Sequence, residues 1–204
     1  MVAPTGLIAP EGAIGVSLRT PVAPAGHVHL TYVLLDRVEL GGQVFFRAGK
    51  SGGGGGGGTL RIQALRRERS ALTGFAELYA TDGGKVVVGG AAFSRCVDGV
   101  ACRALVSVSA ATLHHTAGTS FPLVGGAAFA YGRRYQAVGE AIGTISAGEP
   151  IGTGYVGGRL LYGQLAFDAG VMAASGELGV CRLSCGEGVS VVTIGPALAV
   201  SIRN

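Results

Sequence analysis

The chain has 204 residues, of which 48% are hydrophobic, 14% are charged and 38 are glycine, and its formal net charge is +4. Charged residues usually make up about a quarter of a soluble domain, and the mean hydropathy of +0.47 is high for a protein that faces water on every side. No segment reaches the roughly 18 consecutive apolar residues of a spanning helix, which excludes a helical membrane protein. Something else must cover a large part of the surface.

A membrane-spanning β-barrel would also cover an apolar surface, but it requires aromatic belts at both membrane interfaces and a signal sequence for export. Aromatic residues make up 6% of the chain, and the start MVAPTGLIAPEGAIG has neither a basic beginning nor a long apolar run. We therefore expect no membrane contact. Further copies of the same chain, in a trimer or a larger closed ring, are the simplest cover for the apolar surface.

Alternation of apolar and polar residues dominates the chain and predicts β-strands. Every second side chain is apolar in residues 27–34, and residues 59–65 repeat the pattern. Only residues 65–75 and 162–175 could hold short helices. The sequence therefore predicts a single all-β domain over residues 1–204, an antiparallel sandwich or jelly roll with at most one or two short helices. Further β-rich runs lie at residues 74–81, 85–90, 102–113, 189–195 and 197–204.

The stretch RAGKSGGGGGGGTL (residues 47–60) contains the Gly-Lys-Ser of a phosphate-binding loop. Val44 stands where the first glycine of that motif belongs, and the seven glycines after Ser51 disfavour the helix that must follow. We therefore expect a flexible Gly-rich loop at residues 51–59, which joins neighbouring strands and tolerates shortening.

The four cysteines form two close pairs, Cys96 with Cys102 and Cys181 with Cys185. They are compatible with two small-loop disulfides, a four-thiolate metal site or free thiols, although neither pair has the tight spacing of a zinc knuckle. Because no export signal is recognised, free thiols in a reducing compartment are the default expectation. Cys96–Cys102 is the better disulfide candidate, because the Asp-Gly between these residues favours a turn.

The four histidines are the remaining candidates for metal chemistry. His27 and His29 share one face of a predicted strand and could chelate a metal, whereas the adjacent His114 and His115 point to opposite faces. The simpler interpretation, which we adopt, is that all four are solvated or hydrogen-bonded polar residues. No metal site and no cofactor is predicted.

Arg61, Arg66, Arg67 and Arg69 form a basic cluster that could contact phosphates. The alternatives are a solvated face or salt bridges between subunits. Few aromatic residues lie nearby to stack on bases, so nonspecific contact with a nucleic acid is the most that the cluster predicts.

The sequence contains no nucleophile elbow, zinc-protease motif or dinucleotide fingerprint, so no catalytic residue is predicted. Residues 149–163, EPIGTGYVGGRLLYG, are similar to the hairpin of trimeric dUTP pyrophosphatases. In that family an Asp of the hairpin positions the sugar and activates water, and here Gly152 occupies its position. The resemblance therefore implies no pyrophosphatase activity.

These features lead to the hypothesis of a structural subunit of a virus or phage particle, such as a capsid, decoration or tail protein assembled in the host cytoplasm. Its partners would be copies of itself and other virion proteins. Two alternatives stay open, namely a small β-barrel enzyme or ligand-binding protein with an unrecognised site, and a secreted coat or adhesion protein. A polar pocket would favour the enzyme, whereas a flat apolar surface would favour the subunit.

Overall fold

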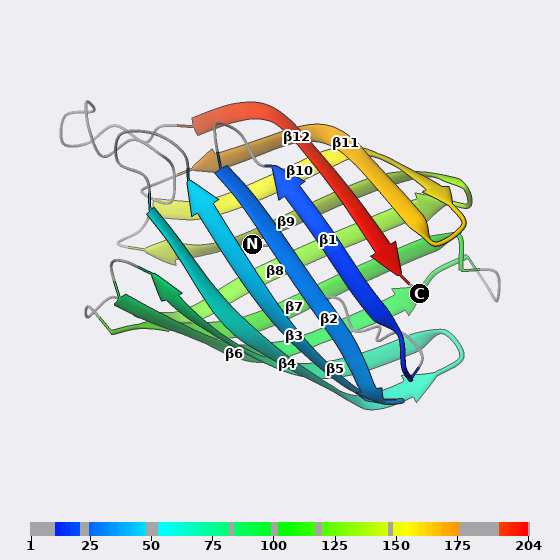
Figure 1. The fold of residues 1–204 in the computed structure, drawn as a ribbon, viewed down its shortest axis with the longest axis horizontal. Helices are drawn as coiled ribbons and strands as arrows, with labels where there is room; N and C mark the ends of the chain where they lie inside the picture. Colours follow the sequence, from blue (N-terminus) through cyan, green and yellow to red (C-terminus); the bar gives the residue numbers. More distant parts are fainter. Residues whose placement is uncertain are drawn as a thin grey trace.

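The computed structural model describes residues 11–20, 25–47, 53–81, 84–98, 102–116, 120–146, 149–175 and 192–203. Within these residues the chain forms twelve strands and no helix. Each strand pairs antiparallel with its sequence neighbours, and β1 also pairs with β12, so the sheet closes into a barrel (Figure 1). The strands are β1 (Ile14–Thr20), β2 (Ala25–Leu35), β3 (Val38–Arg47), β4 (Gly53–Arg67), β5 (Ser70–Thr81), β6 (Gly84–Cys96), β7 (Ala104–His115), β8 (Ser120–Gly132), β9 (Tyr135–Ser146), β10 (Glu149–Tyr162), β11 (Leu165–Ser175) and β12 (Val192–Arg203).

The closed barrel shows that the predicted sandwich or jelly roll is wrong. The reason is that an alternating strand has the same sequence pattern whether it belongs to one closed sheet or to two packed sheets. The windows expected to hold short helices, residues 65–75 and 162–175, instead contain the β4–β5 and β10–β11 hairpins. Among the described residues, no helix is long and apolar enough to cross a membrane.

The strand register divides the side chains between an outer wall and a lumen. Leu30, Val108 and Val156 point outward and are 53%, 51% and 60% exposed. Thr73 and Ser94 point inward and are fully buried. A soluble domain has the opposite arrangement, with its large apolar side chains inside. The outer wall therefore needs an apolar environment.

Five connections lie together at one end of the barrel, which we call the turn end. They join β2 to β3, β4 to β5, β6 to β7, β8 to β9 and β10 to β11. The start of β1 and the end of β12 lie there too, because Gly15 pairs with Arg203. The connections at the opposite end all include residues outside those described.

The structure of the Gly-rich segment differs from the flexible loop that was expected at residues 51–59. From Gly53 onward it is strand β4, paired with β3 and, from Gly55, with β5, while residues 51 and 52 lie outside the described residues. A Cβ added to the inward-facing Gly57 would lie 2.0 Å from a carbonyl oxygen of β5, whereas one on the outward-facing Gly58 would have 3.7 Å of clearance. The closed sheet brings backbones together on its concave face, which explains glycine there. Shortening the run would therefore shift the strand register.

We expect Gly57→Ala to destabilise the barrel by about 1–3 kcal/mol, the usual cost of overpacking, because its methyl group would overlap the Leu78 carbonyl. Gly58→Ala is the matched control and should leave stability nearly unchanged. Urea unfolding in detergent micelles measures both variants. Equal unfolding midpoints would contradict the crowding of the inner face.

Candidate functional site

The lumen is the candidate functional site, because the polar side chains of the strands converge there. Ser17, His29 and Gln43 stand directly opposite one another on β1, β2 and β3. On β6 and β7, the hydroxyls of Ser94 and Ser107 are hydrogen-bonded over 2.6 Å. The hydrogen bond between the two serines satisfies hydroxyl groups that the barrel removes from bulk water.

Two ion pairs join neighbouring strands inside the lumen. Arg61 Nη1 of β4 donates to Glu39 Oε1 of β3 over 2.8 Å. Arg159 of β10 donates twice to Asp168 of β11, from Nε to Oδ1 at 2.6 Å and from Nη2 to Oδ2 at 2.8 Å. The Glu39 and Asp168 side chains are only 10% and 8% exposed. Each carboxylate is thus compensated where water has little access.

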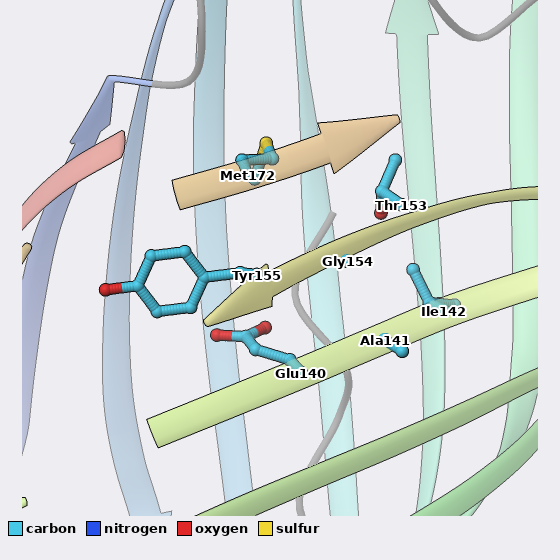
Figure 2. A pocket seen from close by; sticks show the side chains of 7 residues that line it. All are labelled: Glu140, Ala141, Ile142, Thr153, Gly154, Tyr155 and Met172. Atoms are coloured by element: carbon cyan, nitrogen blue, oxygen red, sulfur yellow. The ribbon is translucent and has the colours of Figure 1, made fainter. Parts of the chain in front are cut away.

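Two further carboxylates face the lumen beside tyrosines. The hydroxyl of Tyr79 donates to Glu77 on the same strand. Glu140 of β9 stands directly opposite Tyr155 of β10, and Tyr155 stands opposite Met172 of β11. Figure 2 shows these three side chains around a small pocket. The pocket holds about 10 Å³, the room of about one water molecule, so it is no substrate site by itself.

One side of the lumen is apolar. It is formed by a buried cluster on β5 to β8 that consists of Phe75, Val88, Ala92, Ala111 and Val124. The ion pairs and the other charged groups instead lie on β3 to β5 and on β9 to β11. The lumen therefore has two charged sides and one apolar side.

The four histidine side chains point to the faces of the sheet that the alternation of side chains along a strand predicts. His27 and His29 share the lumen face with their ring centroids 6.0 Å apart, and His27 Nε2 is 2.6 Å from Gln43 Oε1. His114 and His115 are adjacent in β7, so their side chains face opposite sides of the sheet. Within the described ranges, no three His, Cys, Asp or Glu side chains are arranged to hold a metal ion.

The structure separates the arginines of the basic cluster. Arg61 lies in the lumen with Glu39, whereas Arg66, Arg67 and Arg69 are exposed at the β4–β5 turn. Phosphate contact stays a prediction for the three exposed arginines. They lie at the rim of the barrel, outside the candidate site.

The Cys96–Cys102 pair is joined by a disulfide in the β6–β7 connection at the turn end, with a Cα–Cα distance of 5.0 Å. Free thiols were the default expectation, and for this pair that expectation is wrong. Cys181 and Cys185 lie outside the described residues.

Sequence reasoning missed a group of outward-facing tyrosines. Four of the six tyrosines in the chain point outward within four residues of a connection at the turn end. These are Tyr32, Tyr131, Tyr135 and Tyr162, which are 44% to 73% exposed. Arg134 lies over two of them, with its Cζ 5.9 Å from the ring centroid of Tyr135 and 5.7 Å from that of Tyr162. This group of tyrosines can be recognised only once the strand order is known, because the strand order shows that these turns share one end of the barrel.

Comparison with solved structures finds similar barrels at low sequence identity. The KdgM porin in complex with disordered oligogalacturonate is 9% identical with a TM-score of 0.67, and the match covers 93% of this chain and 98% of that one. LpxR from Salmonella typhimurium is also 9% identical, with a TM-score of 0.56 and coverage of 93% and 99%. No protein-family model and no curated protein sequence matches the chain. The likeness establishes a shared fold.

The shared fold contradicts the virion hypothesis. The chain forms a closed barrel similar in fold to the KdgM porin structure, whereas a capsid or decoration subunit was expected to form a jelly roll. The expectations that depended on the hypothesis fail with it, namely virion partners, a cover of further copies, the absence of a membrane and assembly in a host cytoplasm. The physical reason is that an apolar surface has the same composition whether it faces protein or lipid.

We expect Arg159→Gln to destabilise the barrel by about 3 kcal/mol, because it leaves the buried Asp168 carboxylate uncompensated. The double substitution Arg159→Met with Asp168→Leu removes both charges and should recover most of that loss. Arg95→Gln, at an exposed position, is the control and should change stability by less than about 0.5 kcal/mol. Urea unfolding in micelles compares the variants. A single variant as stable as the parent would show that the pair does not stabilise the barrel.

Proposed function

We propose that this protein is a membrane-spanning β-barrel that forms a pore for small polar solutes. The observation that carries the proposal is the division of the described side chains, because large apolar residues are exposed on the outer wall while ion pairs and buried polar residues lie in the lumen beside one apolar cluster. A bilayer core offers no hydrogen-bond partners to the backbone, so a sheet can span it only when closed. The pairing of β1 with β12 provides that closure.

The strand dimensions support this proposal. Strands β2 to β12 have between 10 and 15 residues, and a tilted strand needs about 9–11 residues to cross a bilayer. The strands run obliquely around the barrel in Figure 1. Outward-facing tyrosines at the turn end suit the boundary between hydrocarbon and water, where aromatic rings sit at headgroup level.

We place the barrel in a bacterial outer membrane with its turn end toward the periplasm. Barrels of this class have short periplasmic turns and longer external loops, and the longest connection here, residues 176–191, belongs to the opposite end. The Cys96–Cys102 disulfide at the turn end suits an oxidising compartment. The fold shared with the KdgM porin supports both the location and the pore.

The charges of the lumen favour cations. Among the lumen side chains that the structure describes, four carboxylates, which include Glu77 and Glu140, accompany two guanidiniums, those of Arg61 and Arg159, so the count of charges is negative by two. Charge inside a narrow, low-dielectric passage attracts counter-ions and repels ions of the same sign. The solutes that fit this lumen are small cations and neutral polar molecules.

Refolded from detergent into a planar lipid bilayer, the protein should open stable channels. In a KCl gradient its reversal potential should show that K⁺ is more permeant than Cl⁻. Glu140→Gln removes one of the two excess charges, so we expect the preference for K⁺ to fall by about half. Single-channel recording measures both quantities.

Glu68→Gln is the matched control, because Glu68 is exposed at the β4–β5 turn and lies outside the lumen. Its reversal potential should equal that of the parent protein. A barrel that inserts without conducting would contradict the pore. A preference for Cl⁻ would contradict only the assignment of the solute class.

A further inference from the structure

On the outer wall, a hollow of about 520 Å³ crosses strands β9 to β12 near the turn end. Its floor includes two small outward-facing residues, Gly158 and Ala169, which stand directly opposite each other on β10 and β11. Larger outward side chains on the next row, including Leu160 and Phe167, form its edge toward the turns. The spacing of neighbouring strands makes the hollow about 14 Å long from β9 to β12.

The side of the hollow toward the turn end carries a positive charge. Tyr135, at the start of β9, lines the hollow and stands opposite Leu160. Arg134 precedes it in the β8–β9 turn, with its guanidinium over the rings of Tyr135 and Tyr162. Stacking on two rings holds a guanidinium in place, while its N–H groups lie in the plane and can still donate to an anion. A basic group thus marks one end of an apolar groove.

We propose that this groove binds one anionic phospholipid, with an acyl chain over Gly158 and Ala169 and the phosphate at Arg134. The inference rests on the proposed function, because the groove meets lipid only if the barrel spans a membrane. An elongated apolar hollow with a cation at one end matches an amphiphile with a negative head. Its volume lies in the range of small-molecule sites, about 300–1,000 Å³. An anionic lipid is preferred over a zwitterionic one because the guanidinium pairs with net negative charge.

The backbone at Gly158 allows a sharp test. A Cβ built on this outward-facing glycine would lie 4.0 Å from the nearest atom, so Gly158→Leu fills the groove without a backbone clash. Gly89→Leu is the matched control, since Gly89 also faces outward, on β6, and has no atom within 4 Å of its added Cβ. Arg134→Gln removes the charge, and Arg67→Gln, at the exposed β4–β5 turn, is its control.

Native mass spectrometry of the full chain, released from detergent and titrated with dioleoyl phosphatidylglycerol or dioleoyl phosphatidylcholine, measures the binding. We expect one phosphatidylglycerol per barrel, bound on the order of tenfold more tightly than phosphatidylcholine. Gly158→Leu and Arg134→Gln should each weaken that binding by about tenfold, and the two controls should bind as the parent does.

Equal affinity for the two lipids, or phosphatidylglycerol binding that Gly158→Leu leaves unchanged, would overturn the proposal. A dimer that Gly158→Leu dissolves would assign the groove to a second copy of the chain and overturn it as well. Bilayer conductance of the same samples separates this inference from the pore. A protein that conducts but binds neither lipid overturns only the lipid site, and one that binds phosphatidylglycerol at the groove without conducting overturns only the pore.

Discussion

Every strand of this protein needs a hydrogen-bonded neighbour on each side, and the pairing of β1 with β12 meets that need for the first and last strands. An open sheet would expose two edges with unpaired backbone groups, which a bilayer core cannot satisfy. Closure also bends the sheet. The bend crowds the inner face, so that a Cβ at Gly57 would overlap a carbonyl oxygen of β5, whereas one at the outward-facing Gly58 would make an ordinary contact.

Closure of the sheet also determines which side chains face outward and which face the lumen. The outer wall presents large apolar side chains, whereas two ion pairs, Arg61 with Glu39 and Arg159 with Asp168, join adjacent strands in the lumen. Because Arg159 and Asp168 stand directly opposite each other, the strand register itself brings the guanidinium to the carboxylate. Ion pairs thus lie inside a barrel whose outer wall is apolar. At the turn end, tyrosines and Arg134 form the transition from apolar wall to water.

Much of the secondary structure could be predicted from the sequence, because alternation is a local property. Residues 27–34, 85–90 and 102–113 were expected to be β-rich, and they lie largely within β2, β6 and β7. Barrel closure could not be predicted, since it depends on a pairing between residues more than 170 positions apart. The Gly-rich segment was misleading for a related reason: its place in β4 depends on backbone crowding that only the closed sheet creates. The lumen ion pairs require the register, which no spacing within one strand reveals.

The central claim is that the outer wall faces lipid and the lumen faces water, and adjacent residues of β7 test it most directly. The chain contains no Trp, so Val108→Trp on the outer wall and Ser109→Trp in the lumen each add a single fluorophore. In vesicles, lipids brominated on their acyl chains should quench the fluorescence of the Val108→Trp variant strongly and that of the Ser109→Trp variant weakly, whereas aqueous acrylamide, a small neutral polar quencher, should do the reverse. Equal quenching of both variants by acrylamide, with no effect of the brominated lipids, would contradict the claim.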